Sequence, residues 1–444
     1  MTNKIQPKYC QRSIQVTEKN SIAPERLKYG FLLCFAAVLG ISAFFFNSPE
    51  EILEGSKIII SSSANLLTDY FQLANIGATL INASLMSFLT IGIMVFARVP
   101  ITGTLIAATF TVAGFSMFGK NLYNSIPIML GVILYSRISR VPFKNNLSPA
   151  FFGTALAPLV SEITFNLDLP LYTGIPLGVL AGIVVGLIIP PMACHFVKFH
   201  QGCNLYNIGF TTGIIGTSFI ALFRTFAVKI EVISLVSGGN NHRFVFLLYG
   251  GFLAMFLVGL QCNKWSFKGF VELLRESGRG APDFISIAGF GLTLINMAFL
   301  GIITTTYVLV TGGEINGPTI GGILTVVGFG ACGKHIKNVP PVMLGVYIMG
   351  RLNIYDHSAT PAQLAALFGT TLAPISGRYG PVAGVIAGAL HMALVTNITD
   401  LHAGMNLYHN GFSGGLVAGV LVPIFNHVKA LREAAASKKK VAQE

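Results

Sequence analysis

The sequence predicts an all-α, polytopic membrane protein with about ten spans, arranged as two inverted repeats with broken or re-entrant half-helices. Composition gives the first indication: the 444-residue chain is 53% hydrophobic and only 10% charged, whereas soluble domains carry about 25% charged residues. Several apolar stretches are long enough to cross a hydrocarbon core of about 30 Å. A long segment of the chain also occurs twice, which predicts two related halves.

The duplication relates residues 69–137 to residues 283–351 by a shift of 214 positions without a gap, and 24 of the 69 aligned pairs are identical. It continues beyond this block, because Gly-Thr-Ala-Leu-Ala-Pro at 153–158 returns as Gly-Thr-Thr-Leu-Ala-Pro at 369–374. Membrane proteins built from two related halves commonly place a substrate pathway where the halves meet. We therefore expect a permeation protein.

The organisation of the chain follows from the duplication and from the position of its charges. The predicted parts are a basic N-terminal segment at 1–28, a first membrane repeat at 29–227, a polar linker at 228–242, a second membrane repeat at 243–428 and a basic C-terminal tail at 429–444. The net charge of +12 is concentrated in the tails, which is typical of the cytoplasmic side of a membrane protein. We expect a multi-pass protein of the cell membrane with both termini cytoplasmic, a lipid bilayer around it, no nucleic-acid partner and an open possibility of homo-oligomers.

Equivalent loops with opposite charge predict that the repeats are inverted. Residues 50–54, after the first span of the first repeat, contain three glutamates, whereas the equivalent loop at 264–279 carries four Lys or Arg and two Glu. Under the preference for basic loops in the cytoplasm, these loops belong on opposite sides of the membrane. An odd number of crossings in each repeat produces such an inversion, and five in each give ten.

Two kinds of apolar segment are interrupted by glycine and proline in both repeats. Residues 101–118 and 315–332 form one pair, and residues 148–161 and 361–376, with the Gly-Thr…Ala-Pro element, form the other. Proline lacks a backbone donor and glycine relaxes the direction of the chain, so helices tend to break there. Irregular backbone at membrane depth survives only where protein or a water-filled cavity satisfies its polar groups. These half-helices therefore predict the position of the pathway.

A polar element near the end of each repeat supplies the candidate pathway residues. It reads Gly-Cys-Asn-Leu-Tyr-Asn at 202–207 and Gly-Met-Asn-Leu-Tyr-His-Asn at 404–410. Amides and phenols offer donors and acceptors without formal charge, which suits a neutral or weakly charged solute or a cation held by oxygen atoms. The alternative is that these amides only cap helices. The predicted pathway residues are Asn204, Tyr206, Asn207, Asn406, Tyr408, Asn410, Thr154, Thr370, Asn82 and Asn296.

Two of these residues, Asn82 and Asn296, lie about three turns inside predicted spans, where an amide must either find a partner on another helix or line the pathway. Asp69 and Asp283 are expected to cap the helices that follow them. Lys120 and Lys334 end the interrupted segments, and we expect them at the membrane interface, with attraction of anions as the alternative.

Titratable residues are sparse in the predicted spans. Such groups could couple transport to protons or cations, form vestibules at the two mouths, or lie in water at the interface. Glu162 and Arg378 occupy equivalent positions, and so do His200 and His402. The candidate coupling or vestibule residues are Glu162, Arg378, Glu314, His200 and His402. No His pair at helical spacing with a carboxylate is present in the sequence, so no metal site is predicted.

Over its whole length the chain resembles a bacterial membrane-protein family described as domain of unknown function 1576, whose members hold two copies of the region. This resemblance implies no activity. A more distant, architectural resemblance is to the urea transporters, whose inverted halves each contain a proline–glycine helix break and a later glycine–tyrosine–asparagine pore element. Residues 100–103 and 316–318 resemble the break, and residues 205–207 and 407–410 resemble the pore element. The Asn-Pro pair of those breaks is absent and His409 interrupts Tyr-Asn, so the resemblance implies pore-lining segments rather than urea as the substrate.

Three classes of function compete. A channel-like facilitator for a small, uncharged or weakly charged polar solute is preferred, because equivalent positions of the repeats are mostly amides, hydroxyls and glycine. The alternative is a proton- or cation-coupled secondary transporter. An intramembrane enzyme ranks third, since the sequence contains neither HExxH nor GxSxG. We therefore expect a transport protein that is not an enzyme and uses no cofactor and no metal.

Overall fold

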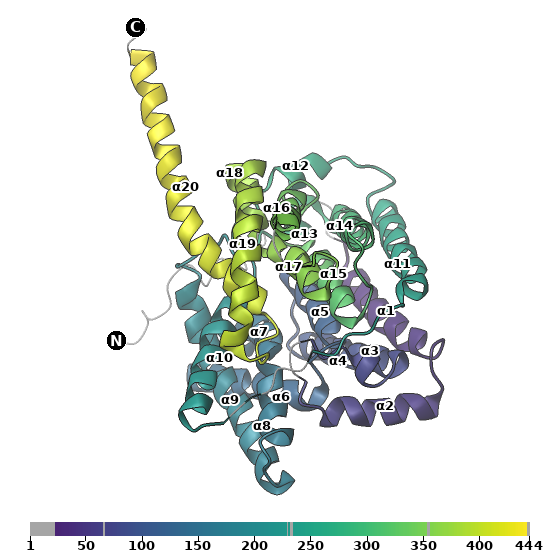
Figure 1. Cartoon of the computed structure of the whole chain (residues 1–444). Coiled ribbons are helices and arrows are strands. Elements are labelled where there is room, and N and C mark those ends of the chain that lie inside the picture. Colours follow the sequence, from purple (N-terminus) through teal and green to yellow (C-terminus); the bar gives the residue numbers. More distant parts are fainter. Residues whose placement is uncertain (1–22, 65–66, 229, 231–233, 353–355, 442–444) are drawn as a thin grey trace.

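The computed structural model describes residues 23–64, 67–228, 230, 234–352 and 356–441, and every regular element in these ranges is a helix (Figure 1). Most of the predicted basic segment at 1–28, part of the predicted linker and the last three residues of the predicted tail lie outside the described residues. The described part contains two isolated β-bridges, Thr68 with Leu235 and Asp283 with Cys332. The all-α prediction is confirmed.

The two repeats are built from corresponding helices. The first contains α1 (Glu25–Ala43), α2 (Pro49–Ser61), α3 (Tyr70–Leu73), α4 (Ile76–Phe96), α5 (Gly103–Phe115), α6 (Leu122–Ile138), η2 (Phe143–Asn146), α7 (Leu147–Phe152), η3 (Gly153–Leu156), α8 (Ala157–Phe165), α9 (Leu171–Phe196) and α10 (Asn207–Thr225). The second contains α11 (Asn241–Cys262), α12 (Phe270–Arg275), α13 (Phe284–Ala288), α14 (Phe290–Val310), α15 (Gly317–Phe329), α16 (Val339–Leu352), α17 (Thr360–Gly369), η4 (Thr370–Leu372), α18 (Ala373–Tyr379), α19 (Pro381–His402) and α20 (His409–Val441).

Eight of the described helices are long and apolar enough to cross a membrane: α1, α4, α9, α10, α11, α14, α19 and α20. The equivalent helices α6 and α16 are also apolar but have 17 and 14 residues. Large apolar side chains point outward on the long helices; Leu180 of α9 is 56% exposed and Phe246 of α11 is 81% exposed. The chain is a polytopic helical membrane protein, and eight helices rather than about ten meet this length criterion.

The repeats are inverted relative to each other, as their equivalent helices α5 and α15 show by packing antiparallel. Gly103, at the start of α5, lies against the backbone of Ala331, just beyond the end of α15. Gly317, at the start of α15, lies against the carbonyl of Met117, just beyond the end of α5. The short helices α2 and α12 accordingly lie at opposite ends of the molecule (Figure 1). We refer to these ends as the α2 face and the α12 face.

Small residues bring the outer helices of each repeat into contact. A Cβ atom on Gly131 of α6 would lie 2.2 Å from the carbonyl oxygen of Ile183 in α9. At the equivalent crossing, a Cβ atom on Gly345 of α16 would lie 2.0 Å from the carbonyl oxygen of Val385 in α19. Without a hydrophobic driving force between helices in lipid, such close van der Waals packing is a main source of association. These crossings therefore hold α9 and α19 against the interior of the bundle.

The predicted half-helices are present. Both α5 and α15 have 13 residues, or about 20 Å of helix, which is shorter than a hydrocarbon core. A 3₁₀ turn separates α7 from α8, and another separates α17 from α18; Pro158 and Pro374 lie in the first turn of the helix that follows. Most of the predicted basic tail at 429–444 belongs to α20, which continues without a break to Val441 and projects beyond the α12 face (Figure 1).

Candidate functional site

The centre of the site is the crossing of α5 and α15. Gly114 of α5 lies against Gly321 of α15, where an added Cβ atom would meet the Gly321 carbonyl oxygen at 2.7 Å. Gly328 of α15 lies against Ala107 of α5, the position equivalent to Gly321, where an added Cβ atom would meet the Ala107 carbonyl oxygen at 3.2 Å. The two half-helices thus touch through their backbones at two equivalent points. This contact fixes the position of the segments that follow each half-helix.

Each half-helix is capped by an aspartate of the other repeat. The carboxylate of Asp283 accepts a hydrogen bond of 2.9 Å from the backbone amide of Gly103 at the start of α5. The backbone amide of Gly317, at the start of α15, donates to Asp69 in the same way. Both aspartates also cap their own short helices, α13 and α3, as the sequence predicted. Burial raises the pKa of both carboxyls, while these amide donors lower it.

A tight turn follows each half-helix and is held by a buried asparagine. The amide nitrogen of Asn82 donates to the carbonyl oxygens of Ser116 and Lys120, both at 2.7 Å. That of Asn296 donates to the carbonyl oxygens of Gly330 and Lys334, both at 2.8 Å. Each turn also contains a glycine with positive φ, which L side chains rarely adopt. The two predicted pathway amides therefore bind backbone.

The turns bring two lysines into the protein interior, where both side chains have 0% exposure. Lys120 Nζ donates to the hydroxyl of Tyr408 at 2.7 Å, and Lys334 Nζ donates to the hydroxyl of Tyr206 at 2.5 Å. Lys334 Nζ also donates to Thr370 Oγ1 at 2.7 Å. Each lysine thus contacts a tyrosine of the other repeat. The expected position of these lysines at the membrane interface is wrong.

Aromatic rings from both repeats surround the lysines and form a continuous cluster. We name it the aromatic collar; it consists of three equivalent pairs, Phe115 and Phe329, Phe152 and Phe368, and Tyr206 and Tyr408. Ring centroids lie 4.4 Å apart for Phe115 and Tyr408 and 4.8 Å apart for Phe329 and Tyr206. The remaining contacts join Phe115 to Phe368, Phe152 to Phe329 and Tyr206 to Phe368. The lysine Nζ atoms lie 4.5 to 5.3 Å from the rings of the two tyrosines, Phe115 and Phe329.

The loops before α10 and α20 carry the tyrosines, and each loop binds the other repeat. The backbone amide of Leu205 donates to the carbonyl of Thr371, and that of Leu407 donates to the carbonyl of Ala155, the equivalent position. Asn204 accepts from the backbone amide of Tyr206 and donates to the carbonyl of Gly411. Asn406 likewise accepts from the backbone amide of Tyr408, at 3.1 Å. These two asparagines bind the backbone of the loops, and Asn204 does not cap α10, whose start has no side-chain cap.

The two helices that follow these loops begin against each other. An added Cβ atom on Gly209 of α10 would lie 3.3 Å from the Cα atom of Gly411 of α20, and one on Gly411 would lie 3.1 Å from that of Gly209. The start of α10 has no side-chain cap at Tyr206, the residue before the helix. Two helix N-termini therefore meet beside the aromatic collar.

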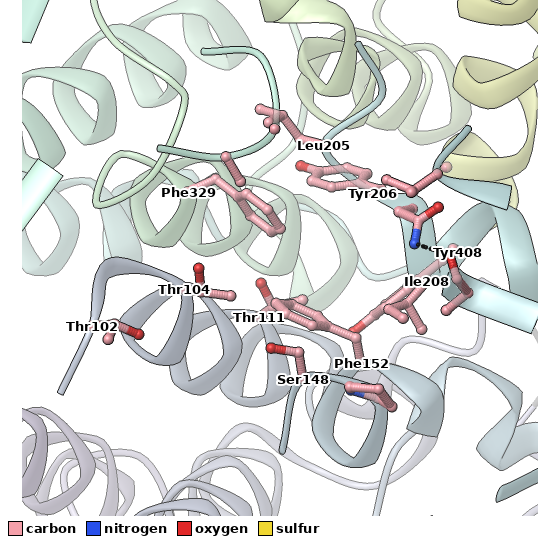
Figure 2. Close-up of a pocket in the computed structure, with 18 of the residues that line it drawn as sticks. Thr102, Thr104, Thr111, Ser148, Phe152, Leu205, Tyr206, Ile208, Phe329 and Tyr408 are labelled. Carbon is pink, nitrogen blue, oxygen red and sulfur yellow. Dashed lines mark hydrogen bonds between the residues drawn. The ribbon is translucent and has the colours of Figure 1, made fainter. Parts of the chain in front are cut away.

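A cavity of about 520 Å³ lies between the repeats and has all six rings of the aromatic collar in its wall (Figure 2). Thr102, Thr104 and Thr111 extend along one side of it from α5 and the residue before it, and Ser148 contributes a hydroxyl from α7 (Figure 2). Residues 280–283, which follow α12, also line the cavity. The cavity therefore extends from the aromatic collar toward the α12 face.

The equivalent route toward the α2 face is occupied by the segment that joins the repeats. Ser237 donates to the carboxylate of Asp69 through its backbone amide and its hydroxyl, at 3.0 and 2.5 Å. Asn316, equivalent to Thr102, donates to Thr360 Oγ1 at 2.9 Å and to the Ser237 carbonyl at 3.4 Å. Neither Asp69 nor Asn316 lines the cavity, whereas their counterparts Asp283 and Thr102 do.

Four of the predicted pathway residues line the cavity, namely Tyr206, Asn207, Tyr408 and Asn410. The other six, Asn204, Asn406, Thr154, Thr370, Asn82 and Asn296, are buried outside its wall. The Thr154 hydroxyl donates to the carbonyl of Phe151 at 2.6 Å. The structure thus brings together the tyrosines and the amides at the starts of α10 and α20, and places the other six residues in supporting contacts.

The candidate coupling residues lie outside the cavity wall as well. Glu162 in α8 is buried and accepts from Asn166 Nδ2 at 3.0 Å, whereas Arg378 in α18 bonds Asn426 at the opposite end of the molecule (Figure 1). Glu314 accepts from the backbone amide of Gly239.

Both predicted coupling histidines are buried close to the polar loops. His200 Nε2 pairs with Asn207 Oδ1 at 2.9 Å, and His402 Nε2 pairs with the Gly213 carbonyl at 3.1 Å. Among the described residues, no three His, Cys, Asp or Glu side chains are grouped as metal ligands would be.

Sequence reasoning missed the phenylalanines of the aromatic collar and the burial of the lysines. A signal was present, since Gly-Phe at 114–115 and Gly-Lys at 119–120 return unchanged at 328–329 and 333–334. A lysine repeated inside a duplicated apolar block could have been interpreted as an intramembrane charge.

Comparison with known proteins assigns the chain to a family. The model of the family described as "Protein of unknown function (DUF1576)" matches residues 48–225 and again residues 262–427. The chain belongs to this family and contains two copies of its domain, as the sequence resemblance implied. No curated protein and no solved structure matches the chain.

Proposed function

We propose that this protein transports a small polar solute through the cavity between its inverted repeats. The observation that carries the proposal is the composition of the cavity wall, to which both repeats contribute equivalent residues, as Phe115 with Phe329 and Tyr206 with Tyr408. Transporters built from inverted repeats bind their substrates at such an interface, beside interrupted helices. A mainly apolar wall with a few placed hydroxyl and amide groups is the usual composition of a small-molecule site.

The asymmetry of the two routes supports access from one face at a time. The cavity extends toward the α12 face, while Ser237 and its neighbours occupy the equivalent route toward the α2 face. Because the repeats are inverted copies, exchange of their conformations would open the second route and close the first. We therefore expect a facilitator in which the aromatic collar is exposed to the two sides in turn.

A facilitator is favoured over a coupled transporter that uses the carboxylates, because Glu162 and Glu314 lie outside the cavity wall. One observation favours proton coupling as the second candidate. Asn410, which lines the cavity, pairs with His391 Nε2 at 3.0 Å and with His409 Nε2 at 3.2 Å. The Nδ1 atoms of both histidines have no partner within the described part of the chain. Buried histidines next to a substrate site could carry protons.

The proposed setting is the cell membrane with the α12 face in the cytoplasm. Glu25, in the first turn of α1, accepts from the backbone amide of Ile101 beside the start of α5, so α1 begins near the α12 face. The C-terminal end of α20 also lies at this face (Figure 1). The basic residues of 264–279 follow α11 there, and basic loops favour the cytoplasm.

The proposal can be tested by blocking the cavity in proteoliposomes. Ser148 lines the cavity, whereas Ser139, just beyond α6, is exposed and lies outside it, so cysteines at these positions form a matched pair. Both are introduced after Cys10, Cys34, Cys194 and Cys262 have been replaced by serine. A bulky, membrane-impermeant maleimide is then added to both sides. Stopped-flow light scattering follows the entry of urea, methanesulfonamide, methanesulfonate and choline.

We expect at least one of these solutes to enter faster than in empty liposomes. Modification of Ser148→Cys should stop this entry, and modification of Ser139→Cys should not. The proposal fails if no solute enters faster than in empty liposomes or if modified Ser148→Cys remains fully active. An imposed proton gradient then separates the two mechanisms, because a facilitator only equilibrates its solute. If the protein accumulates the solute against the concentration gradient of that solute, and if Asn410→Ala abolishes this accumulation, the coupled transporter would be favoured.

A further inference from the structure

We infer that the solute carried by this protein is a small anion. The inference rests on the proposed transport function and adds the charge of the substrate. Four observations support it: two buried lysines without acidic partners, two helix N-termini at the cavity wall, an unpaired hydroxyl in that wall, and phenols placed to relay the positive charge.

The lysines are the main observation. Lys120 and Lys334 are fully buried, and among the described residues their Nζ atoms contact phenols, a threonine hydroxyl and aromatic rings. No ion pair in the described part of the chain includes either lysine. A buried charge without a counter-ion is strongly unfavourable. A bound anion would supply the negative charge that the protein itself does not provide.

Among the described residues of the cavity wall, Asp283 is the one carboxylate, and it does not supply this negative charge. Asp283 lies at the start of α13, where its Oδ1 atom accepts hydrogen bonds from the backbone amides of Gly103 and Ile285. Its charge is therefore directed at the N-terminus of α5 and of α13, which favour an anion. The aromatic collar itself consists of phenyl and phenol rings and carries no acidic side chain.

Two helix N-termini, which are the positive ends of helix dipoles, lie at the same cavity. The first residues of α10 and α20 line the cavity, with Ile208 and Gly209 from one helix and Asn410 and Gly411 from the other. The early backbone amides of a helix carry the positive end of its dipole. With 19 and 33 residues, both helices are long enough for a developed dipole. Because the repeats are inverted, the two N-termini add their potentials at one place instead of cancelling.

An unpaired donor completes the wall. The hydroxyl of Thr111 in α5 has no hydrogen-bond partner among the described residues, although the residue is only 2% exposed. Thr111 lines the cavity and directs its oxygen toward the centre of the view (Figure 2). Its counterpart Thr325, also in the wall, donates to the Gly321 carbonyl at 2.8 Å. A buried polar atom without a partner is costly, and an anion at this position could accept its proton.

The phenols connect the lysines to the cavity. Tyr408 accepts from Lys120, and a phenol that accepts a hydrogen bond still has its own proton to donate. A donor polarised by an ammonium forms a stronger, charge-assisted hydrogen bond. The lysine can thus act on an anion through the tyrosine, with no direct contact. Tyr206 and Lys334 repeat the arrangement from the other side.

The test uses two probes of nearly equal size, methanesulfonate, which is an anion at every accessible pH, and uncharged methanesulfonamide. Entry of each into proteoliposomes is measured with the membrane potential clamped by potassium and valinomycin. The variants are Lys120→Met and Lys334→Met, which remove the charge and keep an unbranched side chain. Lys57→Met is the matched control, because Lys57 is exposed on α2 and pairs only with Glu54. The thermal stability of each protein in detergent is also measured with and without each probe.

In the unmodified protein we expect methanesulfonate to enter faster than methanesulfonamide and to raise the unfolding temperature. Each lysine variant should lose about tenfold or more of the methanesulfonate flux, the size expected for a charge-assisted hydrogen bond. Each lysine variant should also lose the stabilisation by methanesulfonate. The control Lys57→Met should retain both the methanesulfonate flux and this stabilisation. Replacing a lysine removes the cost of burying its charge, but it also leaves a buried phenol without that hydrogen-bond donor. The comparison of the two probes on the unmodified protein remains decisive if a variant does not fold.

The outcomes separate this inference from the proposed transport function. One outcome is that methanesulfonamide enters as fast as methanesulfonate or faster, with this entry blocked by modification of Ser148→Cys. That result would refute the inference that the solute is an anion, and it would leave the proposed transport function intact. Stabilisation by methanesulfonate that depends on the lysines, without flux of any solute, would support the anion site and overturn transport. Absence of both flux and stabilisation would overturn both.

Discussion

Replacing Asn82 or Asn296 by alanine is expected to destabilise the fold and to leave the selectivity of transport unchanged. Each side-chain amide donates two hydrogen bonds of 2.7 or 2.8 Å to carbonyl oxygens on either side of the turn after a half-helix. Both side chains are buried, and neither lines the cavity. The variant therefore removes the support of the turn, while the cavity wall keeps its composition.

The size of the effect follows from the bonds that are lost. A hydrogen bond between membrane helices contributes about 0.6 kcal/mol on average and at most about 1.7. A buried carbonyl left without a donor costs about 1 to 3 kcal/mol. With two carbonyls affected in each variant, we expect a loss of about 2 to 4 kcal/mol. The turns lie at opposite ends of an antiparallel helix pair, about 20 Å apart, so the two losses should add in the double variant.

The assay can use the cysteines of the protein itself. In a background in which Cys10, Cys34, Cys194 and Cys262 are replaced by serine, the remaining cysteines, Cys203 and Cys332, are free and buried. A thiol-reactive fluorescent dye then reports their exposure as the protein unfolds in detergent. Asn397→Ala is the control, because Asn397 is exposed on α19 and its amide donates only within its own helix. If Asn82→Ala kept the unfolding temperature of the unmodified protein and changed which solutes pass, Asn82 would belong to the pathway and the supporting role would be wrong.

Three further predictions concern packing, coupling and topology. Gly114→Ala should lower thermal stability and flux together, because the added Cβ atom would lie 2.7 Å from a carbonyl oxygen of α15; unchanged flux would contradict the backbone contact of the half-helices. Glu162→Gln and Glu314→Gln should keep most of the downhill flux, since both side chains lie outside the cavity wall, and a strict need for either carboxylate would favour the coupled transporter. Cysteines that replace Glu54 and Glu272 should react with impermeant reagents from opposite sides of the membrane, because α2 and α12 lie at opposite faces; labelling from one side would refute the inverted arrangement.

The elements that sequence reasoning predicted are those encoded over short distances in the chain. The length of the apolar stretches predicted the long helices. Glycine and proline predicted the interruptions at α5 and α15, since these two residue types act on the local backbone. Asp69 and Asp283 were predicted as helix caps, because a cap is formed within a few residues. The inversion of the repeats came from the charge of loops, and the antiparallel packing of α5 and α15 agrees with it.

The contacts that escaped prediction join residues far apart in the chain. Lys120 and Tyr408 are separated by 288 positions, and Lys334 and Tyr206 by 128. A lysine at the end of an apolar helix is ordinarily found at the membrane interface, and only the fold shows that these helices end inside the protein. Asn82 could be expected either to find a partner on another helix or to line the pathway, and the choice depended on a turn 34 positions away.

The contacts between the repeats also explain why one copy could not form the site. Asp283 of the second repeat caps α5 of the first, and Lys120 of the first repeat binds Tyr408 of the second. Each repeat thus provides a carboxyl group for the other's half-helix and a lysine for the other's tyrosine. A single copy would leave a helix start without its cap and a buried lysine without its phenol, and both are costly in a membrane interior. The same exchange places the two lysines and the two helix N-termini beside one aromatic collar. This arrangement is a product of the duplication and not of either repeat alone.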